Sequence, residues 1–102
     1  MADIYEILQR IKARPSMYLG SPSILNLKSF LIGYWYARSE LKISRTEQEQ
    51  DFENFQDWIQ EKFNVESSQS WAKIILFYSQ DETDALNNFF KWLEEFQNRD
   101  KK

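Results

Sequence analysis

Apolar residues recur three and four positions apart along most of this 102-residue chain. Because an α-helix turns once every 3.6 residues, this spacing gathers apolar side chains on one face and predicts amphipathic helices. Polar residues suited to capping, such as Asp3 and Thr46, stand where two of the stripes begin. The predicted helices cover residues 3–14, 23–41, 46–63, 68–79 and 81–98. We therefore expect an all-α fold, a compact bundle of about five helices that forms a single domain over residues 1–102.

The second predicted helix is apolar on two faces. One face carries Leu27, Phe30, Leu31 and Tyr34, and the other carries Leu25, Ile32 and Tyr36. A helix that is apolar nearly all round is usually buried, so we expect this one to be central and mostly buried. The alternative for Tyr36 is a place on a surface that contacts a partner.

One stretch of the pattern is ambiguous between helix and strand. Residues 74–78 form an apolar run short enough to be a buried strand. Trp71, Ile75 and Tyr78 nevertheless keep helical spacing, which favours a helix. At the polar end of the chain, residues 99–102 are expected to fray.

The string R-P-S-M-Y-L-G at residues 14–20 is the most distinctive local motif. Pro15 should end the first helix, since the residue before a proline is pushed out of the α region. Residues 17–19 are expected to form a short apolar plug, followed by Gly20 in a positive-φ conformation. The string resembles a segment of the gyrase B family of ATPases, but the chain has no glycine-rich loop like that of the family, so we expect no ATPase.

Composition narrows the possible functions. The chain contains no Cys and no His, which removes disulfides, thiol nucleophiles, the commonest general base and nearly all zinc sites. No calcium-binding or phosphate-binding loop motif is present. We therefore expect no enzyme, no cofactor and no metal site. No leader and no apolar run long enough to span a membrane precedes or interrupts the helices, which predicts a cytoplasmic protein.

Charge is distributed unevenly along the chain. Residues 1–45 carry seven Lys and Arg against three Asp and Glu, a net charge of +4. Residues 46–102 carry six against thirteen, a net charge of −7. The acidic half argues against nucleic acid as a partner, because phosphates reward the opposite sign, and favours a basic protein.

Four carboxylates stand at every fourth position of the third predicted helix: Glu49, Glu53, Asp57 and Glu61. On a helix this spacing aligns them along one outward face, and each like-charged pair costs the helix about 0.2–0.5 kcal/mol. We interpret the row as a candidate surface for a basic partner, with Trp58 and Tyr36 as possible aromatic anchors. The alternative is an ordinary solvated face.

The order of motifs along the whole chain resembles a known group of proteins. R-P-x-M-Y-L-G is followed by S-x-x-x-L-x-x-F-x-x-G-Y, F-x-x-F-x-x-W-I, S-W-A-K-I-I and A-L-x-x-F-F-x-x-L-x-E-F. This order is similar to that of small bacterial immunity proteins of polymorphic toxin systems, of which contact-dependent growth inhibition is one. The resemblance spans about residues 4–96, and Ser16 departs from the glycine usual at that position.

The resemblance implies a function that fits the charge pattern. Such immunity proteins bind one cognate toxin, commonly a nuclease with a basic cleft, and block it. A row of carboxylates can imitate phosphates and steer association with that cleft. The resulting hypothesis is a monomeric, non-catalytic immunity protein. The alternative is a non-catalytic adaptor or homo-oligomeric scaffold that uses the spare apolar face of the second helix.

Overall fold

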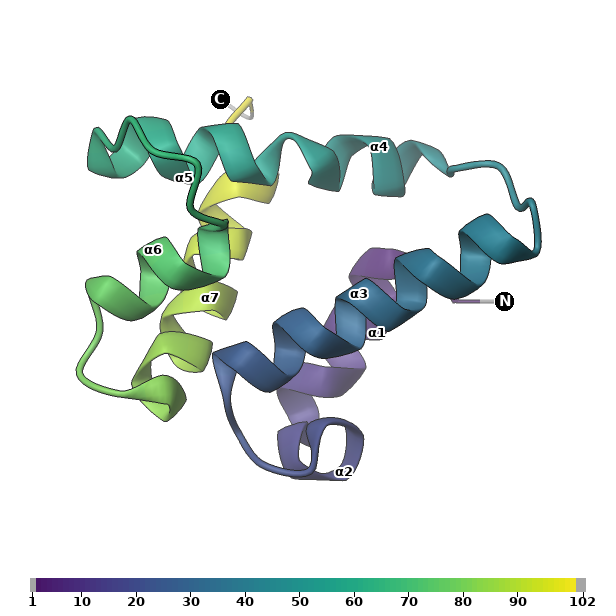
Figure 1. The fold of residues 1–102 in the computed structure, drawn as a ribbon, viewed down its shortest axis with the longest axis horizontal. Coiled ribbons are helices and arrows are strands. Elements are labelled where there is room, and N and C mark those ends of the chain that lie inside the picture. The colour runs from purple at the N-terminus through teal and green to yellow at the C-terminus, as the bar shows by residue number, and fades with distance from the viewer. Residues whose placement is uncertain (1, 101–102) are drawn as a thin grey trace.

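The computed structural model describes residues 2–100 and is helical throughout its regular structure. The helices are α1 (Ile4–Ala13), α2 (Pro15–Leu19), α3 (Ile24–Glu40), α4 (Glu47–Glu53), α5 (Phe55–Phe63), α6 (Trp71–Phe77) and α7 (Glu82–Gln97). Figure 1 shows α4 and α5 end to end along one edge of the molecule, with α7 crossing beneath them and α3 lying in front of α1. The predicted all-α fold is confirmed.

The structure has two more helical segments than the sequence predicts. Pro15 begins α2 as well as ending α1, because its fixed φ suits the first turn of a helix. Gly20 closes α2 at φ 84°, as expected. The predicted plug is wrong, since Met17 and Tyr18 on α2 are exposed.

The second additional segment arises from a break in the third predicted helix. The backbone N–H of Asn54 bonds to the carbonyl of Asp51, three residues back, which tightens the chain between α4 and α5. Elsewhere the ambiguity over residues 74–78 is resolved in favour of helix, because α6 extends through Phe77. Within residues 2–100, no helix combines the length and apolarity needed to cross a bilayer.

The core is a cluster of aromatic rings centred on α5 and α7. The Phe55 ring lies 5.5 Å from Phe89, 5.4 Å from Phe96 and 5.6 Å from Trp71, in each case edge to face. Such pairs add about 0.5–1.5 kcal/mol each beyond the area they bury. On the far side of the core, α1 contributes buried aliphatic side chains.

The prediction that the second helix is central and mostly buried is wrong. Only Ile24, Leu27 and Leu31 of α3 are buried, where the helix packs against α6 and α7. On the opposite face, Ile32 is 57% exposed and Tyr36 67% exposed. No other helix of the described chain covers this face, so an all-round apolar pattern produces an exposed apolar surface instead of burial.

Candidate functional site

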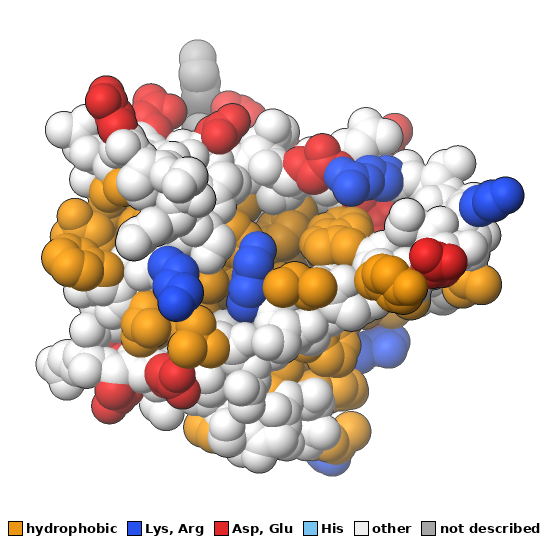
Figure 2. All heavy atoms as spheres, in the orientation of Figure 1, with side chains coloured by type: hydrophobic (Ala, Val, Ile, Leu, Met, Phe, Trp, Pro, Cys, Tyr) orange, Lys and Arg blue, Asp and Glu red, His pale blue; other side chains and the backbone are white. Residues whose placement is uncertain are grey.

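Three of the four residues in the predicted acidic row are exposed on the outer surface of α4 and α5: Glu53, Asp57 and Glu61. Phe55 and Ile59 are buried on the opposite side, which turns outward the residues two positions away from each. Figure 2 shows acidic side chains gathered along this edge of the molecule. We call Glu53, Asp57 and Glu61 the acidic edge.

Glu49, the fourth predicted member, does not belong to this surface. Its side chain is fully buried and receives hydrogen bonds from the Tyr34 hydroxyl at 2.5 Å and the Thr46 backbone N–H at 2.8 Å. Arg38 adds two contacts, from Nε at 2.6 Å and from a terminal nitrogen at 2.9 Å. The prediction of an exposed Glu49 is therefore wrong, and its carboxylate instead completes a capping box with Thr46.

The surroundings of Glu49 keep it ionised. Burial alone would raise its pKa, but the hydrogen bonds from Tyr34 and Thr46 and the charge of Arg38 outweigh burial and hold the pKa below its usual range. Burial and the bond to Glu49 raise the pKa of Tyr34 in turn. This buried group therefore ties α4 to α3 rather than offering a charge to solvent.

Asp51 makes a second, similar connection. It accepts hydrogen bonds from the Tyr5 hydroxyl at 2.6 Å and from Arg99 at 2.7 Å. Although burial opposes it, the bonds from Arg99 and Tyr5 lower the pKa of Asp51. Two tyrosine–carboxylate–arginine groups thus fix α4, one to α3 and the other to α1 and the end of α7.

The anchoring of Arg99 changes the expectation of a frayed end. A terminal nitrogen of Arg99 donates to the carbonyl oxygen of Phe96 at 2.7 Å, and the guanidinium lies 3.9 Å from the centre of the Phe96 ring. The predicted fraying is therefore wrong at Arg99. Residues 101 and 102, which the same prediction included, lie outside the described residues.

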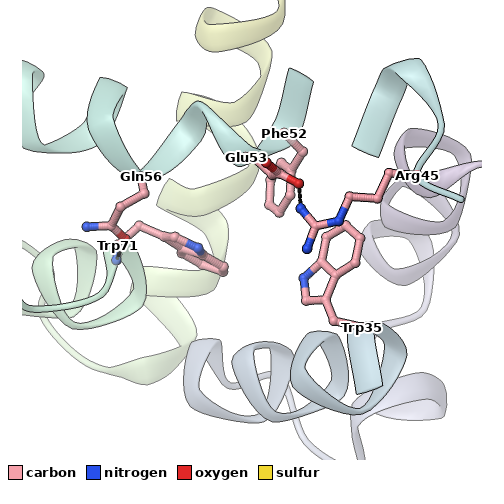
Figure 3. A pocket seen from close by; sticks show the side chains of 6 residues that line it. All are labelled: Trp35, Arg45, Phe52, Glu53, Gln56 and Trp71. Carbon is pink, nitrogen blue, oxygen red and sulfur yellow. Dashed lines mark hydrogen bonds and ion pairs between the residues drawn. The ribbon is translucent and has the colours of Figure 1, made fainter. Parts of the chain in front are cut away.

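Glu53 forms an ion pair with Arg45, from the loop before α4. The Arg45 guanidinium also lies over Trp35, 5.3 Å from the ring centroid. Figure 3 shows the pair at the side of a pocket of about 130 Å³ that Phe52, Gln56 and Trp71 complete. A base just outside the acidic row therefore compensates one of its charges, which leaves Asp57 and Glu61 as the members without an ion pair among residues 2–100.

The two predicted aromatic anchors lie in different surroundings. Trp58 is half-buried, stacked on Phe55 at 6.0 Å and set edge to face against Phe96 at 5.7 Å. Tyr36 stands on α3, one turn after exposed Ile32. Trp58 therefore adjoins Asp57 on α5, whereas Tyr36 belongs to the separate apolar face of α3.

The sequence pattern did not predict the partners of Glu49 and Glu53. A signal existed for Glu49, because Tyr34 and Arg38 are four positions apart and share a face of α3. The capping box was a second signal, since its carboxylate reaches back to the start of its own helix instead of outward. For Arg45 no periodic signal was available, because it lies in a loop.

The described side chains on this surface do not form a metal-binding site. Within residues 2–100, no three acidic side chains are grouped closely enough to hold a metal ion. The chemistry that the acidic edge and Trp58 offer is electrostatic and apolar contact with another molecule. Comparisons with protein-family models, curated proteins and solved structures find no match to this chain.

Proposed function

We propose that this chain is a non-catalytic immunity protein that binds a cognate bacterial toxin, a nuclease with a basic cleft, and blocks that cleft or an adjoining surface. In this proposal it acts as a monomer in the cytoplasm, without nucleic acid or membrane as a partner. The resemblance in the order of motifs motivates the proposal, and the exposed acidic edge is its main structural support.

Rigidity matters because a charged surface gains more from binding when its geometry is fixed in advance. The acidic edge sits on helices whose inner residues, Phe55 and Ile59, are fully buried. The groups around Glu49 and Asp51 fix α4, which carries Glu53, on both sides, and the burial of Phe55 and Ile59 fixes α5, which carries Asp57 and Glu61. Asp57 and Glu61 therefore lose little conformational freedom beyond their own side chains when they meet a basic surface.

The proposed contact surface differs from the one predicted from the sequence. It consists of Glu53, Asp57 and Glu61 with Trp58 beside them, and it leaves out Glu49. Asp57 and Glu61 are its principal charges, since Glu53 already pairs with Arg45. Trp58, half-buried next to Asp57, supplies an aromatic surface of the kind that often dominates interface energy.

The test first asks whether a neighbouring gene encodes a toxin with a nuclease domain, and then measures inhibition of that domain with a labelled nucleic acid substrate and by growth rescue. The wild-type chain should inhibit at stoichiometric concentrations. Asp57→Lys combined with Glu61→Lys should weaken inhibition about 100-fold, because charge reversal places like charges together. The control combines Glu6→Lys with Glu40→Lys, which changes the net charge equally on α1 and α3. Full inhibition by the first variant would exclude the acidic edge, and no inhibition by the wild type would refute the proposal.

A second candidate function is a homo-oligomeric scaffold or adaptor, favoured by the uncovered face of α3. Ile32 and Tyr36 lie one turn apart on it, and Leu41 just beyond the helix is 70% exposed. Exposed apolar side chains grouped in this way commonly mark contact sites. Sedimentation equilibrium distinguishes the candidates: a stable dimer that Tyr36→Glu dissociates would support the scaffold, and a monomer at high concentration would exclude self-association.

A further inference from the structure

The end of α3 adopts an unusual backbone conformation. Lys42 has φ 54°, its N–H donates to the Ser39 carbonyl, and the next N–H donates to the Arg38 carbonyl, each at 3.0 Å. These two bonds define a Schellman turn, in which the left-handed position is usually glycine. The equivalent position after α5 is Asn64, a residue type that tolerates this conformation. Lysine does so less readily, so the lysine at this position calls for an explanation.

Lys42 lines a pocket of about 250 Å³ whose walls include three positively charged side chains. We call it the Lys42 pocket. Its lining residues are Trp35, Arg38, Ser39, Lys42, Ile43 and Arg45. Glu49 neutralises Arg38, and Glu53 pairs with Arg45. No carboxylate within residues 2–100 forms an ion pair with Lys42, so the three cations and two carboxylates leave a net charge of +1.

We propose that the Lys42 pocket binds a carboxylate, the side chain of an Asp or Glu on a protein partner. The net charge of +1 matches one carboxylate, whereas a phosphate monoester carries more negative charge at neutral pH. Trp35 and Ile43 give the pocket apolar walls, and Tyr36 and Leu41 beside it on the chain are largely exposed. Apolar contacts around a single charged group are typical of a protein interface.

In this arrangement Lys42 and Arg45 donate to the incoming carboxylate. Arg38 stays paired with Glu49, because both of its contacts to Glu49 are short, and it contributes only electrostatic attraction to the incoming carboxylate. Arg45 has to share its guanidinium between the ligand and Glu53. Replacing Glu53 with Gln should therefore free Arg45 and strengthen binding. The proposal does not rest on the immunity function, although the two surfaces meet at the ion pair between Arg45 of the Lys42 pocket and Glu53 of the acidic edge.

The test is an NMR titration of the ¹⁵N-labelled full chain with the capped peptide acetyl-Leu-Glu-Leu-amide. Saturable shifts are expected at the Trp35 indole N–H and at the amides of residues 38–45. A peptide with Gln in place of Glu should produce much smaller shifts. Inorganic phosphate is the third probe, and tighter binding of phosphate than of the peptide would overturn the assignment to a protein carboxylate.

Substitutions at position 42 distinguish the effect of the lysine charge on binding from the effect of the backbone conformation on stability. Lys42→Gly should raise the urea midpoint of unfolding, because glycine suits the left-handed turn, yet weaken peptide binding about tenfold through loss of a charge-assisted hydrogen bond. Asn64→Gly relaxes the matching turn after α5 and should leave binding unchanged, and Lys42→Arg should preserve it. Undiminished binding by Lys42→Gly, or weaker binding by Glu53→Gln, would refute the proposal.

Discussion

Replacing Glu49 with Ala tests whether this residue is a buried structural acid or part of an exposed row. The substitution removes the counterion of Arg38, whose side chain is only 11% exposed, and the acceptor for the Tyr34 hydroxyl and the Thr46 N–H. Breaking a buried ion pair by removing one partner typically costs about 3–5 kcal/mol. Since a domain of this size has about 5–15 kcal/mol of stability in total, the variant should lose a large part of it.

An exposed Glu49 would give a result of opposite sign. In a row of like charges on a solvated face, its removal would relieve one repulsive pair with Glu53 and stabilise the helix by about 0.2–0.5 kcal/mol. The two interpretations therefore differ by several kcal/mol, well beyond the error of a denaturation experiment.

The measurement is urea unfolding followed by far-UV circular dichroism at pH 7. Glu47→Ala is the matched control, because Glu47 lies on the same helix but is exposed, and its effect should stay within about 0.5 kcal/mol. Combining Glu49→Gln with Arg38→Met should reduce the free energy of unfolding by less than the sum of the two single changes, because each single change leaves a buried charge unpaired and the double change leaves none. A Glu49→Ala variant as stable as wild type would show that Glu49 is not the buried partner of Arg38.

Three further outcomes follow from the structure. The folded-state pKa values of Glu49 and Asp51 lie below their unfolded values of about 4, so their contribution to stability is present above that pH and is lost as the pH falls through the folded-state values. Urea midpoints of unfolding should therefore fall less between pH 7 and pH 3 for Glu49→Gln than for wild type. Equal changes in the midpoint for the two proteins would contradict this. Arg99→Ala should cost about 1–2 kcal/mol, because it removes the bond to Asp51 and the contact with Phe96, while Lys73→Ala, on an exposed site, should cost almost nothing in the same assay. Gly20→Ala should lower the free energy of unfolding by about 1 kcal/mol, because φ 84° is unfavourable for alanine even though no atom lies within 4 Å of the added methyl group. An unchanged stability in thermal unfolding would show that the turn adapts.

The sequence predicted the helices well because their signals are local. Asp3 and Thr46 cap α1 and α4 as expected, and Phe52, Phe55 and Ile59 form the buried stripe that helical spacing requires. The two additional helical segments occur where the local sequence is compatible with more than one backbone structure. Pro15 can end one helix and begin the next, and nothing in the spacing around Asn54 indicates a break.

The candidate surface was less predictable because it depends on contacts between helices. Helical spacing placed Glu53, Asp57 and Glu61 outward correctly. It failed at Glu49 because Tyr34 and Arg38 approach from α3, which a pattern within one helix does not contain. The burial of α3 was overestimated for a related reason: its apolar second face requires a covering helix, and the described chain supplies none.

Association kinetics test whether the acidic edge binds a basic toxin surface. The association rate constant with the cognate toxin domain, once identified, would be measured at low and high salt. We predict fast association at low salt that slows at least tenfold at high salt, and a small salt dependence for Asp57→Lys combined with Glu61→Lys. An unchanged rate and salt dependence in that variant would contradict the claim.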